Sequence, residues 1–216
     1  GLDSTTTLAI ALSEGYKVYA FTIDYHQRHS FEIEASKKVL QDYPDVKHVI
    51  FNVDLSVIGG SALTDTSIDV PIEESDDIPV TYVPARNTIF LSLASSFAEK
   101  HSINNIFIGV NSIDYSGYPD CRPEYFEAYQ NMANLATKSS VEVKQSPITI
   151  KTPLLYLSKA ETIQKGHALG VNYKLTVSCY QANEQGEACG RCDSCMLRKK
   201  GFKDAGLPDE TTYAAP

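Results

Sequence analysis

The strongest constraint on the fold is a repeated alternation of segments with strand-like and helical apolar patterns. Short apolar runs predict buried strands over residues 17–24, 48–53, 105–110 and 148–150. Helical patterns lie among them, over residues 8–12, 31–41, 88–100, 123–138 and 158–170. Strands separated by helices of this length predict an α/β fold, a doubly wound parallel sheet with right-handed crossovers and helices on both faces.

Local signals predict several helix ends. Ser158 and Glu161 have the spacing of a capping box, and Gly170 is placed to end the helix that the box opens. Ser30 is the expected N-cap of the helix over residues 31–41. Pro123 suits the first turn of the helix that follows it.

Composition places the chain among globular proteins and excludes several other classes. Of its 216 residues, 43% are hydrophobic and 21% are charged, which is enough apolar material for a core. No apolar run approaches membrane-spanning length, so we do not expect the chain to be an integral membrane protein. The formal net charge of -8 argues against non-specific nucleic-acid binding, because phosphates would be repelled at long range.

A long irregular stretch interrupts the alternation between about residues 55 and 79. It contains Gly59 and Gly60, several Ser and Thr residues, and an acidic cluster at residues 73–77. Such a stretch inside a compact domain is usually a lid, a binding loop or a mobile segment.

The first six residues predict an anion site, because they run directly into a helix. Backbone N–H groups at a helix start point toward a bound phosphate, and a glycine lets the backbone approach it closely. Asp3 would be repelled by phosphate oxygens unless a divalent cation lay between them, so it is a candidate Mg²⁺ contact. An ordinary N-cap is the alternative. The candidate ATP-binding residues are Gly1, Leu2, Asp3, Ser4, Thr5 and Thr6.

Four cysteines near the C-terminus have the spacing of a metal site. Three of them are separated by two-residue gaps, and a glycine supplies the tight turn that brings the sulfurs together. With no secretory evidence, metal ligation is favoured over a disulfide framework. A closed zinc site with a structural role is expected, and an iron–sulfur cluster is the rival. The predicted ligands are Cys179, Cys189, Cys192 and Cys195.

Polar loops after the predicted strands supply the candidate substrate-binding residues, because open parallel sheets bind ligands at these ends. Arginines there can meet an anionic group, and carboxylates can hold the donor edge of a guanine-like ring. Each candidate also has a purely structural explanation. Arg28 and His29 could lie in a solvated loop, and Lys159 could be an ordinary solvated lysine. Asn87 could cap a helix, and Asp114 and Asp120 could form turns. The candidates are Arg28, His29, Arg86, Asn87, Asp114, Tyr118, Asp120, Arg122 and Lys159.

Taken together, these segments resemble the 7-cyano-7-deazaguanine synthase family, a branch of the PP-loop ATP pyrophosphatase superfamily with an adenine nucleotide alpha hydrolase-like fold. Residues 1–4 resemble the second half of the family's S-G-G-x-D-S loop, and residues 25–29 its Y-x-Q-R-H block. Residues 83–87 resemble its V-P-x-R-N block, and residues 114–122 its D-x-S-G-Y-P-D-C-R block. Residues 178–180 and the later cysteines resemble its zinc motif, which residues 197–201 continue.

The resemblance implies ATP-dependent conversion of 7-carboxy-7-deazaguanine and ammonia to 7-cyano-7-deazaguanine in queuosine biosynthesis, by activation of the carboxylate and then of the amide. It implies structural Zn²⁺, ATP with Mg²⁺, a cytoplasmic homodimer, and neither membrane nor direct nucleic-acid partners. Residues 1–175 would form the nucleotide-binding domain and residues 176–216 the zinc-binding segment and tail. A first strand, with the first serine and glycine of the loop, is expected upstream of Gly1.

Two other functions are compatible with parts of the sequence. One is another PP-loop adenylating enzyme acting on tRNA or another macromolecule. The net acidity counts against it, since the clear basic cluster is confined to residues 198–203. The other is a non-catalytic, zinc-stabilised binding module. A hydrophobic strand ending in Ser-Gly upstream of Gly1 would favour the enzyme.

Overall fold

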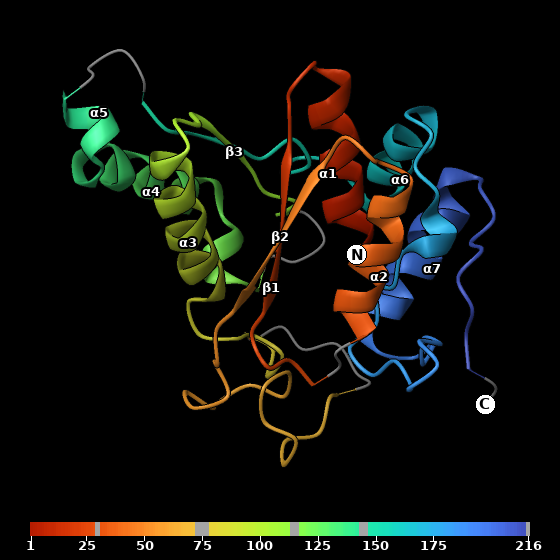
Figure 1. Cartoon of the computed structure of the whole chain (residues 1–216). Helices are drawn as coiled ribbons and strands as arrows, with labels where there is room; N and C mark the ends of the chain where they lie inside the picture. Colours follow the sequence, from red (N-terminus) through yellow and green to blue (C-terminus); the bar gives the residue numbers. More distant parts are fainter. Residues whose placement is uncertain (29–30, 72–77, 113–116, 143–146, 215–216) are drawn as a thin grey trace.

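A computed structural model gives the fold of residues 1–28, 31–71, 78–112, 117–142 and 147–214. Helices and strands alternate along most of the chain (Figure 1). In order, the elements are α1 (Leu2–Ser13), β1 (Tyr19–Asp24), α2 (Phe31–Gln41), β2 (Lys47–Asn52), α3 (Arg86–Lys100), β3 (Asn105–Phe107), η1 (Pro119–Cys121), α4 (Pro123–Ala136), α5 (Lys138–Glu142), β4 (Thr149–Lys151), α6 (Lys159–Ala168), η2 (Tyr173–Leu175) and α7 (Asp193–Ala205).

The strands pair in parallel, as the alternation predicts. β1 pairs with β2, with Tyr19 opposite Lys47, and β3 pairs with β4, with Asn105 opposite Thr149. Helices α3 and α4 lie on one side of the strands, and α1, α2, α6 and α7 lie on the other (Figure 1). The α/β class, the parallel pairing and the helices on both faces are therefore confirmed.

A cavity of about 510 Å³ separates the two strand pairs. The edge of β1 lines it over residues 19–23, and β3 with its continuation lines it over residues 105–109. Leu8 of α1 and Leu91 of α3 also contribute to its walls, and Gly1 lies along it. Within the described residues, the sheet thus consists of two halves whose edges face a largely apolar space.

The first helix begins earlier than its apolar pattern predicts. The helical pattern is clear only from Leu8, but α1 starts at Leu2, because the Thr5 N–H donates to the Gly1 carbonyl over 3.1 Å. Leu2 is buried, in a core cluster formed by α1, α6 and α7. The residues expected to form a loop around phosphate are therefore the first turn of a packed helix.

Other boundaries follow local chemistry. The capping box is confirmed, because the Ser158 hydroxyl accepts from the Glu161 N–H and the Glu161 carboxylate accepts from the Ser158 N–H. The helix expected over residues 123–138 is α4, which ends at Ala136, and the short helix α5 begins at Lys138. Helix α7 was not predicted; it ends at Gly206, whose φ of 70° gives the left-handed C-cap.

Several sequence expectations concern parts of the chain outside the described residues. These are the Ser30 cap and the acidic cluster. The described parts of the long irregular stretch, residues 53–71 and 78–85, contain no helix or strand. None of the helices that the structure describes is both long and apolar enough to cross a membrane.

Candidate functional site

Most hydroxyl groups in the first turn of α1 bond to the helix backbone and do not face outward. Thr5 and Thr6 are buried, and their hydroxyls donate back to the carbonyls of Gly1 and Leu2. Thr6 also shares a 2.7 Å hydrogen bond with the Tyr173 hydroxyl. Of the three hydroxyl side chains expected to face an anion, only Ser4 is exposed.

The end of β3 approaches this turn closely because it carries a glycine. A Cβ on Gly109 would lie 2.9 Å from the carbonyl carbon of Asp3 and 3.0 Å from the Ser4 nitrogen. No side chain fits at such separations, so any other residue would push the sheet and α1 apart. Gly109 therefore holds the turn against the end of the strand where ligands bind in parallel sheets.

Asp3 and Lys159 form an ion pair within this region. The Lys159 ammonium lies 2.9 Å from Oδ1 and 3.0 Å from Oδ2 of Asp3. Lys159 is 8% exposed, so the interpretation as an ordinary solvated lysine is wrong. Gly201 of α7 makes room for its stem, since a Cβ there would lie 2.4 Å from the Lys159 Cγ. The pair joins the start of α6 to the first turn of α1.

Arg86 lies beside Tyr25 at the end of β1. Its guanidinium carbon is 5.9 Å from the ring centroid, and Nη1 lies 3.5 Å from the Tyr25 hydroxyl. Burial raises the pKa of the Tyr25 phenol, so this tyrosine stays neutral and contributes its ring and hydroxyl to the contact. Arg86 lines the same cavity as Gly1 and Ser4. The structure thus places one predicted substrate contact beside the predicted ATP loop.

The alternative interpretation of Asn87 as a helix cap is wrong, because it is the second residue of α3. Its backbone N–H donates to Oδ2 of Asp120 over 3.0 Å, and its side-chain amide donates to the Asp120 carbonyl over 2.9 Å. The amide also donates to the sulfur of Cys121. The cap is therefore supplied by Asp120, whose negative charge suits a helix N-terminus. Both residues are buried and hold η1 against α3.

Tyr118 links this region to the cysteine segment. It is 7% exposed, and its hydroxyl lies 2.9 Å from the Thr81 hydroxyl and 3.4 Å from the Tyr180 hydroxyl. Tyr180 directly follows Cys179 in the sequence. A chain of contacts therefore runs from the predicted substrate-binding block to the predicted metal ligands.

The remaining candidates lie apart from Arg86. Arg28 donates to the carbonyls of Ala62 and Ile68 and lines a separate cavity of about 290 Å³, together with Arg191. Arg122 is exposed and donates to the Pro119 carbonyl. His29 and Asp114 fall outside the described residues. The structure therefore brings together Arg86, Tyr118, Asn87 and Asp120, with Asp3 and Lys159 at the neighbouring turn.

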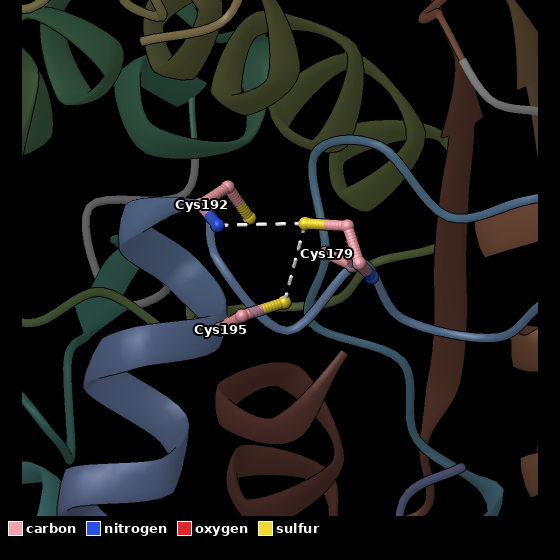
Figure 2. A group of neighbouring side chains, drawn as sticks. Cys179, Cys192 and Cys195 are labelled. Atoms are coloured by element: carbon pink, nitrogen blue, oxygen red, sulfur yellow. Dashed lines mark hydrogen bonds between the residues drawn. The ribbon is translucent and has the colours of Figure 1, made fainter. Parts of the chain in front are cut away.

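The four C-terminal cysteines converge. Their sulfur atoms all lie within 4.8 Å of one another. Figure 2 shows Cys195 on α7, Cys192 at its start and Cys179 on a separate loop, with the three sulfurs turned toward one another. A tetrahedral zinc site with Zn–S bonds of about 2.3 Å needs sulfurs roughly 3.8 Å apart, so a small contraction gives the required geometry. The cysteine cluster can hold a metal ion.

Electrostatics within the cysteine cluster favour a cation. Hydrogen bonds from Cys179 and then from Cys195 lower the pKa of the Cys192 thiol far below its ordinary value. The hydrogen bond with Cys192 in turn raises the pKa of Cys179, because it favours the protonated form of that thiol. Neighbouring thiols here cannot all lose their protons without mutual repulsion. A divalent cation at the centre would stabilise negative charge on every sulfur and so allow all four to be thiolates.

Arg198 ties the cysteine segment to the rest of the domain. It is 2% exposed, and its guanidinium donates to the Thr176 hydroxyl, the Tyr173 carbonyl and the Asp209 carboxylate. The sequence indicated only a basic cluster here and gave no signal of burial. Lys199 and Lys200, which follow it in the sequence, are exposed, and a run of basic residues does not show which of them is buried.

Comparison with known proteins gives the chain its family. A family model described as "Queuosine biosynthesis protein QueC" matches residues 1–206. The chain belongs to this family. The matched span contains the α1 turn, the Arg86 region and all four cysteines, so the resemblance read from five separate blocks is confirmed.

Three similar proteins carry the same name. A protein of Cellvibrio japonicus named 7-cyano-7-deazaguanine synthase is 59% identical over 214 residues, which cover 99% of this chain and 94% of that protein. The protein of the same name from Saccharophagus degradans is also 59% identical, with the same coverage. The one from Legionella pneumophila is 57% identical and covered to 93%.

Proposed function

We propose that the chain is an ATP-dependent 7-cyano-7-deazaguanine synthase that converts 7-carboxy-7-deazaguanine and ammonia to the nitrile. The observation that carries this proposal is 59% identity to a protein of that name over 99% of the chain. The alignment leaves no large part of the site without a counterpart. The arrangement of the α1 turn beside Arg86 supports the same conclusion from geometry.

The chemistry explains why a phosphate site is needed. A carboxylate is a poor electrophile, so one of its oxygens must first become a good leaving group. Attack of the carboxylate on the α-phosphorus of ATP gives an acyl-adenylate and pyrophosphate. Ammonia then attacks the acyl carbon, and AMP leaves with the carboxylate oxygen to give an amide. A second adenylation, on the amide oxygen, allows loss of AMP and two protons from the amide, and the product is the nitrile.

The residues have distinct parts in this scheme. Backbone N–H groups at the start of α1 and the Ser4 hydroxyl would bind phosphate oxygens. Arg86 would stabilise negative charge on the substrate carboxylate or the α-phosphate. Asp3 would share Mg²⁺ with the phosphates, and when bound this ion would neutralise charge that accumulates on the departing pyrophosphate. The geometry of the Asp3–Lys159 pair supports a role for the lysine in orienting that carboxylate.

Zinc is the metal we propose for the cysteine cluster. Four thiolates without an open position suit a closed tetrahedral site, which stabilises the fold and takes no part in the reaction. The burial of Cys179, Cys192 and Cys195 supports a structural rather than a catalytic role. Close Cys-x-x-Cys spacing also suits an iron–sulfur cluster, and metal analysis of the purified protein separates the two.

The remaining proposals concern cellular context. We propose that the protein acts in the cytoplasm as a homodimer on a free deazaguanine base, without direct contact to nucleic acid. Exposed apolar side chains on α4 and α5, including Leu135 at 82% and Val141 at 59% exposure, are available for contact with a second copy. Sedimentation velocity distinguishes a dimer from a monomer.

The test of the proposed function is a reconstituted reaction. The protein with its complete N-terminus and zinc is incubated with Mg²⁺, ATP, ammonium and 7-carboxy-7-deazaguanine. We expect mass spectrometry to detect the nitrile, with formation that depends on ATP and on ammonium. Unchanged carboxylate in the presence of an intact metal site would contradict the proposal. Modification of tRNA, with the free carboxylate left unchanged, would identify a macromolecular substrate.

A further inference from the structure

Glu32 places a carboxylate in the cavity that the proposed ATP turn and substrate residues share. It lies in the first turn of α2 and lines this cavity together with Gly1, Ser4 and Arg86. Tyr25 and Gln27, from the loop after β1, line the same space. The carboxylate therefore faces groups from α1 and α3 that would contact ATP and the carboxylate substrate.

The other carboxylates of this region are already engaged. Asp3 binds Lys159, and Asp120 accepts the Asn87 N–H. Glu32 makes no hydrogen bond or ion pair at bonding distance with any other residue that the structure describes. Glu34, two positions further along the same helix, instead faces solvent and pairs with Lys37 at 2.7 Å. Glu32 is thus the carboxylate with lone pairs available to a reactant.

Its surroundings also make this carboxylate a stronger base than an exposed one. Burial raises the pKa of Glu32, against the opposing influence of the Arg86 guanidinium. The Tyr25 phenol, which also faces it, stays neutral. Ammonium is a much weaker acid than an ordinary carboxylic acid, so a raised carboxyl pKa makes proton transfer from ammonium less unfavourable.

We propose that Glu32 is the general base that takes a proton from ammonium and so supplies ammonia to the activated substrate. This inference rests on the proposed function. The Glu32 carboxylate becomes a carboxylic acid as ammonium becomes ammonia. The ammonia nitrogen forms a bond to the acyl carbon, the bond from that carbon to the AMP oxygen breaks, and its electron pair leaves on AMP. The attached nitrogen loses a second proton to solvent, and Glu32 returns its own proton to solvent before the next cycle.

The test separates activation of the carboxylate from capture of ammonia. Glu32→Gln removes the base and keeps the size of the side chain, and Glu34→Gln is the matched control on the same helix. Pyrophosphate exchange into ATP, measured with 7-carboxy-7-deazaguanine and no ammonium, follows activation alone. Amide and nitrile formation follows ammonia capture. Hydroxylamine, which is largely unprotonated at neutral pH, replaces ammonium in a third assay.

We expect Glu32→Gln to keep pyrophosphate exchange within about threefold of the wild type and to lose amide formation by about 100-fold, the size of a general-base contribution. Hydroxamate formation from hydroxylamine should stay within about tenfold, and Glu34→Gln should behave as wild type. Equal loss of exchange and amide formation, or unchanged amide formation, would overturn the proposal. Loss of the folded state is detected by thermal melting, and Glu32→Asp, which keeps a carboxylate, should then retain part of the ammonia-dependent rate. Absence of exchange in the wild type would instead refute the proposed function.

Discussion

The ammonium of Lys159 lies 2.9 Å from Oδ1 of Asp3, although the two residues are 156 positions apart in the chain. The lysine begins α6, and the aspartate lies in the first turn of α1. The Lys159 side chain is 10% exposed and that of Asp3 is 30% exposed, so the pair is only partly screened by water. Three helices thus meet at this turn, because α7 packs directly over the lysine stem through Gly201.

Loss of the Lys159 ammonium should weaken ATP binding. In Lys159→Met the Asp3 carboxylate loses its partner and its fixed orientation, so we expect KM for ATP to rise about tenfold. The stability loss should be about 1–2 kcal/mol, less than for a fully buried pair because Asp3 is partly exposed. Lys165→Met, on an exposed position of α6, is the control. An unchanged KM for ATP would show that Lys159 takes no part in ATP binding.

Loss of one cysteine ligand should release the metal. We expect Cys189→Ser to contain much less than one zinc per chain and to melt at a lower temperature, because metal binding contributes to the folding free energy. The control is Cys121→Ser, since this buried thiol lies outside the cysteine cluster and should leave the metal content unchanged. Elemental analysis and thermal melting measure both effects. Full zinc content in Cys189→Ser would contradict the four-thiolate site.

Arg198 and Asp209 should make stability depend on pH in the acid range. Burial by itself would raise the pKa of Asp209, but hydrogen bonds from Arg198 and Tyr213 outweigh it and lower the pKa. The Asp209 carboxylate therefore stabilises the fold above the ordinary Asp pKa of about 3.9, and this stabilisation is lost as the pH falls through the lowered pKa of the folded state. Urea unfolding of Asp209→Asn should show a shallower loss of stability than the wild type below about pH 4.

Removal of the Arg198 guanidinium should be more damaging than a surface change. In Arg198→Met the Asp209 carboxylate, whose side chain is only 11% exposed, loses its partner, and we expect a loss of about 3–5 kcal/mol in the free energy of unfolding. Lys200→Met removes an exposed partner of Asp204 from the same helix and should cost less than about 1 kcal/mol. Equal effects of the two substitutions would show that Arg198 does not anchor α7.

Much of the fold could be predicted because its signals are local. The capping box at Ser158 depends on residues three positions apart, and the parallel pairs follow from the alternation of apolar runs. The cysteine cluster was equally accessible, since short spacing by itself brings three of the four sulfurs together. The start of α1 at Leu2 was missed because its first turn is stabilised by α6 and α7, which no local pattern reveals.

The site was less predictable, because its contacts join distant segments. The sequence allowed Asn87 to be a cap, whereas Asp120 supplies that cap from 33 positions away. Lys159 was a candidate site residue with a solvated lysine as the alternative, and the packing of α7 over it is what excludes that alternative. Nothing in the sequence spacing of Glu32 indicated the cavity that it lines.

Activation of the substrate carboxylate as an adenylate is tested most directly by following the carboxylate oxygen atoms. 7-Carboxy-7-deazaguanine labelled with oxygen-18 in the carboxylate is converted in the presence of ATP and ammonium, and the nucleotide products are analysed by mass spectrometry. We expect two AMP molecules for each nitrile, each with one labelled oxygen, since both carboxylate oxygens leave on AMP. Unlabelled AMP, or label recovered in inorganic phosphate, would contradict activation by adenylation.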